Sequence, residues 1–411
     1  MWGGLIDYFS YTGDGSYVLA TIQGLIAQKG PNNDYIVPEH KFDEVSTNKN
    51  RPRMCVTDPP EQGNDDQAFW GLALMSALEN QYPSPPSDQP QWLHLAEALF
   101  NHQASLWDTA SCNGGLKWQI YPENAYGYDY KNSVSTGSFF QMAARLARYT
   151  GDQKYFDWAI KAWDWCQAVG LIGPVYDVYD GTNDKLNCRE VDHTQWSYNV
   201  AIFLEGAAAL YNLTGSDLWR QRTAGLLDAS IVFFSPFPNA SNIMYEAACE
   251  TYGNCNTDQL SFKAYLARWL AKTSVLAPFT SSSIRPMLEA SAQAAAASCS
   301  GGLDGVTCGT KWFVGAWDGT WGAGQQLAAL EVVQALLVAD AGIPNSQFLN
   351  PPAMQLRNVN YTWPPTEFGT RLWAQFSHSQ ISSDATSFTS YTFVSALFAS
   401  LGAIAWAVAG S

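Results

Sequence analysis

The stretch ARYTGDQKYF, residues 147–156, places a Thr-Gly pair between an apolar helical pattern and an aromatic-bearing helical pattern. Glycine is typical of the left-handed residue that ends a helix, and an aspartate after it favours the start of the next one. The same arrangement occurs in FSYTGDGSYV (9–18) and YNLTGSDLWR (211–220). Gly151 and Gly215 lie 64 residues apart, and Gly13 lies about two such periods before Gly151.

This period predicts further helix breaks where turn residues do cluster: QYPSPPSDQPQW (81–92), LAPFTSSSIRPM (276–287) and VADAGIPNSQF (338–348). Six helical hairpins with short turns at one end and long aromatic loops at the other predict an all-α fold, an (α/α)6 barrel over residues 1–370. An open helical solenoid is the alternative. Only about twelve residues precede Gly13, so we expect the first helix to be missing or trimmed.

Composition excludes several classes of protein. Apolar residues make up 47% of the 411 residues, which indicates a sizeable core, and the net charge of −15 argues against nucleic acid and against a basic membrane-binding patch. The 17 Trp and 20 Tyr suit flat-faced polar ligands such as sugars. With five histidines and no CxxC, nothing asks for a metal, and we expect no cofactor.

Two adjacent carboxylates, Asp65 and Asp66, precede the helical pattern QAFWGLALMSALE. At the irregular first turn of a helix the backbone can aim both carboxyls at one point. A retaining glycosidase holds two carboxyls roughly 5–5.5 Å apart, one as nucleophile and one as acid/base. Two anions so close resist joint ionisation, which separates their pKa values. The structural alternative is that these aspartates only cap the helix.

The segment GNDDQAFWGLALMSALE (63–79) resembles the signature of glycoside hydrolase family 76, the endo-α-1,6-mannanases, and is most similar to its fungal cell-wall branch. The resemblance continues through CNGGLKWQI (112–120), HTQWSYNVAIFLEGAAALYNLTG (193–215) and CGTKWFVGAWDGTWGAGQQLAALEVVQ (308–334), and so covers nearly the whole domain. It implies an (α/α)6 barrel and a retaining mechanism, with Asp65 as nucleophile and Asp66 as acid/base. It further implies that the bacterial members cut α-1,6-mannan and that the fungal branch acts on the mannose core of glycosylphosphatidylinositol (GPI) glycans. That branch would pass the anchored protein to a β-1,3-glucan acceptor.

Further residues are candidates for binding substrate. Trp residues could stack on sugars, with core packing as the alternative for each of them. Polar residues around the helix start in VDHTQWSYNVAIF (191–203), and Asp318 beside Trp317, could bind hydroxyls. Asn132 could also bind a hydroxyl or, alternatively, cap a helix. The substrate-binding candidates are Trp70, Trp118, Asn132, Asp192, Thr194, Tyr198, Asn199, Trp317 and Asp318. Trp196 and Trp321 are further stacking candidates, and His193 is interpreted as structural.

Eight cysteines predict disulfides formed in an oxidising compartment. Close spacing favours Cys249–Cys255 and Cys299–Cys308. The other four cysteines can pair in three ways, of which we predict Cys55–Cys112 and Cys166–Cys188. The sequons at Asn212, Asn239 and Asn360 predict N-glycosylation.

The end of the chain has the layout of a GPI-attachment signal, with a polar spacer (371–392) before an uncharged apolar tail (393–411). A buried final helix is the alternative. We therefore expect a secreted or cell-surface monomer whose membrane contact is a GPI anchor and which acts on an α-1,6-mannoside or GPI-glycan donor. The start of the chain has no signal-peptide pattern, and MWGGLIDYF resembles an internal part of the family, as a truncated gene product would. Rival interpretations are a non-catalytic mannan-binding protein, an inverting enzyme and a plain hydrolytic endo-α-1,6-mannanase.

Overall fold

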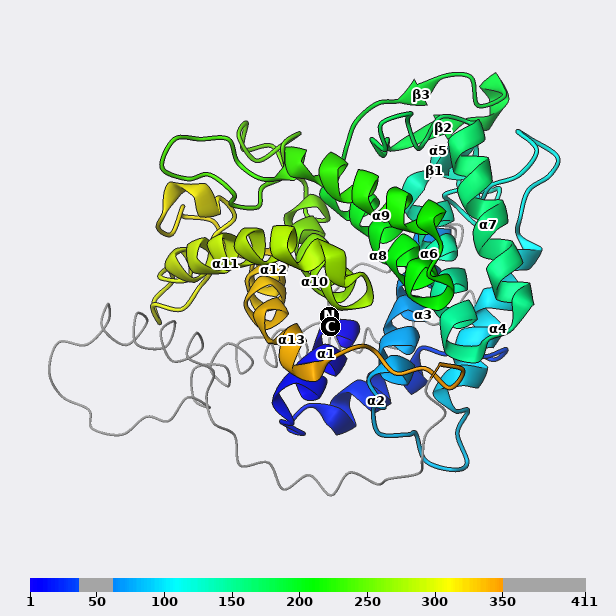
Figure 1. The fold of residues 1–411 in the computed structure, drawn as a ribbon, viewed down its shortest axis with the longest axis horizontal. Coiled ribbons are helices and arrows are strands. Elements are labelled where there is room, and N and C mark those ends of the chain that lie inside the picture. The colour runs from blue at the N-terminus through cyan, green and yellow to red at the C-terminus, as the bar shows by residue number, and fades with distance from the viewer. Residues whose placement is uncertain (37–61, 350–411) are drawn as a thin grey trace, which may run out of the picture.

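Helices form a closed inner ring in the computed structural model, which describes residues 1–36 and 62–349 (Figure 1). The ring helices are α1 (Trp2–Thr12), α3 (Asn64–Glu79), α6 (Ser133–Thr150), α8 (Ser197–Thr214), α10 (Phe262–Leu276) and α12 (Ala323–Gln334). Each contacts the next one along the chain, and α12 also contacts α1. The predicted (α/α)6 barrel is therefore confirmed, the open solenoid is wrong, and α1 is present as a short ring helix.

A second layer of helices packs on the outside of this ring. Its members are α2 (Val18–Ala27), α4 (Trp92–Ser105), α7 (Gln153–Ala168), α9 (Asp217–Ala229) and α11 (Ser281–Ser298), each in contact with the ring helix before it. The short helices α5 (Ala125–Tyr128) and α13 (Val338–Ala341) complete the described α-helices. The layers differ in burial as their sequences require: α8 is buried continuously from Ser197 to Leu210, whereas only one face of each outer helix is buried.

The short turns lie where the sequence repeat places them. Gly13, Gly151 and Gly215 end α1, α6 and α8 in the left-handed conformation, with φ of 73°, 75° and 64°. Asp152 then caps α7 by accepting a hydrogen bond from the amide of Lys154 at 2.8 Å. Predicted breaks at 81–92 and 276–287 join α3 to α4 and α10 to α11.

The long loops precede the ring helices and gather at the end of the barrel where these helices begin. Two of them pair as a small antiparallel sheet in the order β1 (Tyr130–Asn132), β2 (Gly181–Asn183), β3 (Val191–Asp192). Lys131 pairs with Thr182, and Thr182 pairs with Val191. The sheet lies beside the beginnings of α6 and α8 and fixes the loops that lead into them (Figure 1).

A belt of buried charged residues crosses the interior of the ring, one from each ring helix. We call Asp7, Glu79, Arg145, Glu205, Arg268 and Glu331 the polar belt; all are buried. Arg145 donates to Glu79 at 2.7 Å and lies 3.7 Å from Glu205, and Arg268 donates to Asp7 at 2.6 Å. Ion pairs thus link helices that are far apart in the sequence.

Three disulfides occur among the described residues. Cys249–Cys255 and Cys299–Cys308 confirm the two local predictions. Cys112 pairs with Cys188, so the predicted Cys55–Cys112 and Cys166–Cys188 bridges are wrong. Cys166 is a buried free thiol inside α7, whereas the loops before α6 and α8 meet and bring Cys112 to Cys188.

Several sequence predictions lie outside the described residues: the partner of Cys55, the sequon at Asn360, the end of the barrel domain at 370, the spacer 371–392 and the tail 393–411. Within residues 1–36 and 62–349, no helix has both the length and the apolar character to cross a membrane.

The other two sequons differ in their surroundings. Asn239 is exposed on a loop, as a glycan requires. Asn212 lies in α8, where its side-chain amide donates to the carbonyl of Leu276 at 3.2 Å and its oxygen accepts from Arg148 at 2.8 Å. A glycan at Asn212 would break this contact between helices, so the structure argues against that prediction.

Candidate active site

Asp65 and Asp66 occupy the second and third positions of α3, at the end of the barrel where the long loops gather. One carboxylate oxygen of Asp66 accepts from the amide of Gly63 at 2.9 Å, and Asp65 Oδ1 accepts from the amide of Asp66 at 3.0 Å. The other oxygen of Asp65 accepts from the indole N–H of Trp118 at 2.9 Å. Asp65 is half-buried and Asp66 is exposed, so the first is held in place while the second faces solvent.

Gly63 brings the two carboxylates to one point. A Cβ atom at this glycine would lie 2.0 Å from Asp65 Oδ1 and 3.1 Å from Asp66 Oδ2. These two oxygens are therefore closer together than the roughly 6.5–9.5 Å between carboxyls that an inverting glycosidase requires. This proximity argues against an inverting arrangement of these two carboxylates, and the retaining mechanism stays a prediction.

The protonation of the pair suits acid–base chemistry near neutral pH. Burial and the negative charge of Asp66 raise the pKa of Asp65 to about 7, although the Asp66 amide and the Trp118 indole oppose this shift. Limited hydration and the charge of Asp258 also raise the pKa of Asp66. Two close carboxyls with raised pKa values resist joint ionisation, so one holds a proton while the other is charged.

Trp118 is positioned from both sides by the backbone. Its amide donates to the carbonyl of Tyr130 at 2.6 Å, and its carbonyl accepts from the amide of Asn64 at 2.7 Å. The side chain of Asn64 donates to the carbonyl of Lys117 at 2.9 Å. The start of α3 and the loop 106–132 therefore form one unit that sets the Trp118 indole against Asp65.

A third carboxylate, Asp180, lies beside this unit and was missed by sequence reasoning. The hydroxyl of Tyr130 donates to Asp180 at 2.7 Å. Burial raises the pKa of Asp180, while contacts with Tyr130, Asn199 and Trp196 favour its ionised form. The sequence around it, VYDVYDGTN (175–183), offers six polar or aromatic candidates and no spacing that selects one.

Tyr198 connects Asp180 with the catalytic candidates. Burial, and then the charges of Asp180 and Asp65, raise its pKa well above the usual value for tyrosine. Its ring stacks on Phe262 with the centroids 3.9 Å apart. The structure therefore gathers Asp65, Trp118, Asp180 and Tyr198, of which only Asp180 was not predicted.

Two predicted substrate-binding residues have structural roles instead. Trp70 stacks on the buried ring of Tyr35 with the centroids 5.2 Å apart. Asn132 is buried and caps α6 by accepting from the amide of Ser135 at 3.2 Å. These contacts correspond to the alternatives that Trp70 packs in the core and that Asn132 caps a helix.

The remaining polar candidates stabilise their own loops. Asp192 accepts from the amide and the hydroxyl of Thr194 at 2.9 and 2.7 Å. Asp318 accepts from the amides of Thr310, Lys311 and Thr320, and these hydrogen bonds lower its pKa although burial opposes the shift. Sequence reasoning placed these aspartates near sugars because their loops are aromatic, but a carboxylate in such a loop also satisfies backbone amides.

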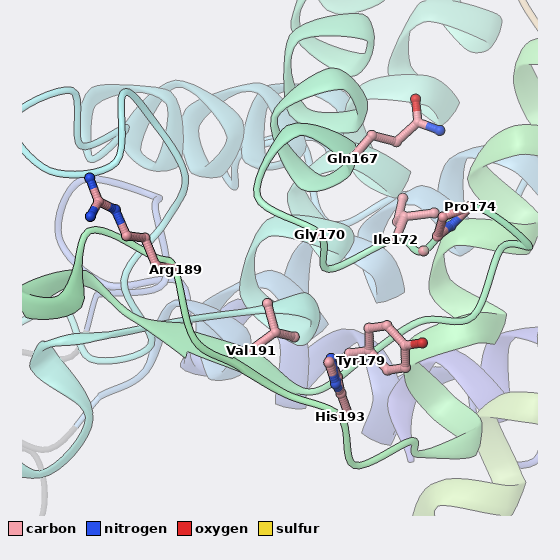
Figure 2. Close-up of a pocket in the computed structure, with 9 residues that line it drawn as sticks. Gln167, Gly170, Ile172, Pro174, Tyr179, Arg189, Val191 and His193 are labelled. Atoms are coloured by element: carbon pink, nitrogen blue, oxygen red, sulfur yellow. The ribbon is translucent and has the colours of Figure 1, made fainter.

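A surface hollow of about 540 Å³ lies between the end of α7, the loop that follows it and strand β3 (Figure 2). Figure 2 shows Tyr179 and His193 side by side on one wall, and their ring centroids are 4.4 Å apart. His193 is exposed, and the structural role that the sequence suggested for it stays a prediction. The hollow contains neither Asp65 nor Asp66. Among the described residues, no group of three or more His, Cys, Asp or Glu could hold a metal ion.

Comparison with known proteins agrees with this geometry. The profile of glycosyl hydrolase family 76 matches residues 1–347. The chain is 48% identical over 345 residues to the mannan endo-1,6-alpha-mannosidase DCW1 of Saccharomyces cerevisiae, covering 84% of this chain and 72% of that protein. It is 39% identical over 345 residues to the mannan endo-1,6-alpha-mannosidase DFG5 of the same yeast, covering 83% and 70%.

Solved structures share the fold. The crystal structure of Dfg5 from Chaetomium thermophilum in complex with glucosamine aligns with a TM-score of 0.76 at 39% identity, over 87% of this chain and 85% of that one. An inactive variant of the α-1,6-mannanase GH76A of Salegentibacter sp. HEL1_6, in complex with α-1,6-mannotriose, aligns with a TM-score of 0.60 at 16% identity, over 82% and 88%. The protein is a glycoside hydrolase and belongs to glycosyl hydrolase family 76.

Proposed function

We propose that this protein is a retaining glycosidase or transglycosylase that acts on α-1,6-linked mannose. The observation that carries the proposal is the pair Asp65 and Asp66, whose carboxylates converge beside Gly63 at the loop end of the barrel. Relatives at 39–48% identity are mannan endo-1,6-alpha-mannosidases, which supports this substrate class.

The two aspartates have different roles. Asp65 attacks the anomeric carbon, and the bond to the leaving oxygen breaks as Asp66 gives that oxygen its proton. The Trp118 indole and the Asp66 amide hold the Asp65 carboxylate in place for the attack. In the second step, Asp66 takes a proton from water or from a sugar hydroxyl, which attacks the same carbon and releases Asp65. Burial raises the pKa of Asp65 to about 7, and the Trp118 indole, the Asp66 amide and the N-terminus of α3 oppose this by favouring its charged form. The attack therefore proceeds from the state in which Asp65 is charged and the shared proton resides on Asp66.

Other contacts of the site would serve the donor sugar. Asp180 lies on the Asp65 side, because Tyr130, which donates to Asp180, also accepts from the amide of Trp118, the residue that holds Asp65. The charges of Asp180 and Asp65 both raise the pKa of Tyr198, after its burial. A carboxylate held by Tyr130 can accept hydrogen bonds from mannose hydroxyls. Asp180 therefore joins the predicted residue Tyr198 in the proposed donor site.

The biological donor and acceptor extend the proposal. We propose the mannose core of a GPI glycan as donor and a β-1,3-glucan as acceptor, at the cell surface of a fungus. The disulfides support passage through an oxidising compartment. The tail at 393–411 would direct GPI attachment. A plain hydrolytic endo-α-1,6-mannanase is the alternative, and it differs only in the acceptor of the second step.

The test is proton NMR of the products from α-1,6-mannotetraose, with and without a β-1,3-glucan oligosaccharide. We expect an initial α-anomer, or a hybrid product, from the wild type, and its loss in Asp65→Asn and Asp66→Asn. With a donor that carries an activated leaving group, Asp66→Asn should recover part of its first step, whereas Asp65→Asn should not, because only Asp66 assists departure.

Each outcome decides between the alternatives. A hybrid product establishes transglycosylation, and free mannosides alone establish hydrolysis. An initial β-anomer would overturn the role of Asp65 as nucleophile. Mannoside binding without any turnover by the wild type would favour a non-catalytic binding protein.

A further inference from the structure

The acid/base candidate faces a different part of the barrel from the nucleophile. Asp65 is held by Trp118, from the loop before α6. Asp66 lies one turn before Phe69 on α3, and the ring of Phe69 packs on Tyr265 of α10 with the centroids 4.9 Å apart. The charge of Asp258, from the loop before α10, acts on Asp66 from the same direction by raising its pKa. In a retaining enzyme the acid/base lies on the side of the leaving group, and the acceptor enters from that same side. The acceptor sugar should therefore lie toward the beginning of α10.

The loop before α12 flanks the same side. Leu260, two residues after Asp258, packs so closely on Gly324 at the start of α12 that a Cβ there would lie 3.0 Å from the Leu260 carbonyl carbon. The first turn of α10 also meets the loop before α12, because Lys263 donates to the carbonyl of Thr310 at 2.5 Å. Residues just ahead of Gly324 are thus on the Asp66 side of the site.

This loop is held rigidly. Asp318 accepts from the amide of Lys311 at 2.9 Å and from the Thr320 hydroxyl at 2.7 Å. The indole N–H of Trp317 donates to the carbonyl of Thr320 at 2.7 Å. The Cys299–Cys308 disulfide closes the segment that precedes it. A rigid loop can present a side chain to a ligand with little further loss of conformational entropy.

Trp321 is the aromatic residue that this loop leaves open. Its side chain is 75% exposed, compared with 37% for Trp317. Trp317 packs over Gly301, where a Cβ would lie 2.2 Å from its ring, and its N–H is already bonded. The ring of Trp321 therefore presents an open flat face on a braced loop, whereas the ring of Trp317 is covered in part by Gly301.

We infer that Trp321 is the stacking platform for a hexose on the acceptor side of the active site. A flat indole matches the apolar C–H face of a pyranose, and a neutral sugar suits a chain with a net charge of −15. This inference rests on the proposed retaining mechanism. Under this inference Trp321, and not Trp317, stacks on the sugar, and Asp318 stabilises the conformation of the loop.

The experiment separates the donor step from the acceptor step. The donor is α-1,6-mannobiosyl fluoride, whose leaving group needs no sugar on the acceptor side, and the acceptors are α-1,6-mannotriose and a β-1,3-glucan pentasaccharide. For Trp321→Ala we expect the acceptor concentration at half-maximal transfer to rise about tenfold, and for Trp321→Phe about threefold. Donor hydrolysis without acceptor should stay within about twofold of the wild type. Phe348→Ala is the matched control, because Phe348 is also exposed but lies against Gly151, at the opposite end of the barrel.

A binding measurement tests the same inference without turnover. In the Asp65→Asn protein, the indole N–H resonance of Trp321, assigned by its loss in Trp321→Phe, should shift when either acceptor is added. Unchanged acceptor dependence in Trp321→Ala, or an unshifted resonance at saturating acceptor, overturns the inference and leaves the proposed function intact. Absence of turnover of mannobiosyl fluoride by the wild type overturns the proposed function instead, and the resonance shift then decides on the platform alone.

Discussion

At the scale of single residues, the active site depends on a missing side chain. Gly63 has an extended backbone, with φ of −85° and ψ of 154°, which any residue can adopt. A methyl group there would lie 2.0 Å from Asp65 Oδ1 and would push this carboxylate away from its position. We expect Gly63→Ala to fold normally while kcat/KM on α-1,6-mannotetraose falls by about 10²-fold, as for other small displacements of reacting groups.

Gly15→Ala is the control for this prediction, because the nearest side-chain atom to a Cβ at Gly15 is 4.0 Å away. It should keep the kcat/KM of the wild type. Circular dichroism and thermal unfolding verify that both variants fold. Wild-type kcat/KM in Gly63→Ala would show that the convergence of the two carboxylates beside this glycine does not matter for the reaction.

At the scale of elements, the sequence predicted what local signals determine. Thr-Gly caps at Gly13, Gly151 and Gly215 placed the turns, because a left-handed cap is a property of a few adjacent residues. The adjacent aspartates were found for the same reason. Asp180 was not found, because its importance comes from Tyr130 on a strand 50 residues away, and no local pattern records that contact.

The cysteine pairing failed for a similar reason. Only the two short bridges could be read from spacing, whereas Cys112 meets Cys188 because two long loops converge on the small sheet. Polar loop residues such as Asp318 were also interpreted as functional. A carboxylate that accepts hydrogen bonds from backbone amides cannot be distinguished, in a sequence, from one that binds a sugar hydroxyl.

The Cys112–Cys188 bridge should stabilise the protein more than a local bridge does. It closes a segment of 76 residues, compared with 6 for Cys249–Cys255, and a longer closed loop removes more freedom from the unfolded chain. We expect the Cys112→Ser/Cys188→Ser double variant to lower the free energy of unfolding by about 2–4 kcal/mol, as measured by denaturant titration. Cys249→Ser/Cys255→Ser is the control and should lose less.

Peptide mapping without reduction tests the pairing directly. The linked peptide should contain Cys112 and Cys188, with Cys166 recovered as a free thiol. A peptide that links Cys166 to Cys188 would contradict the structure and restore the prediction from the sequence.

At the scale of the whole molecule, the polar belt joins all six ring helices in the interior. Arg145 of α6 is its most connected cation: it donates to Glu79 of α3 and to the hydroxyl of Ser76, and it lies 3.7 Å from Glu205 of α8. The charge of Arg145 offsets part of the burial that raises the pKa of Glu205. Arg145 thus compensates two buried carboxylates from its neighbouring helices.

Removing Arg145 alone should therefore destabilise the protein far more than removing Arg145 together with its two carboxylate partners. We expect Arg145→Met to lower the free energy of unfolding by about 3–5 kcal/mol, because Glu79 and Glu205 stay buried and lose the cation that pairs with both of them. The triple variant Arg145→Met/Glu79→Gln/Glu205→Gln should recover much of that loss, since no uncompensated charge remains at this junction. Denaturant titrations of both proteins provide the measurement. If the triple variant is as unstable as the single one, shape rather than charge compensation is what Arg145 supplies to the closed ring.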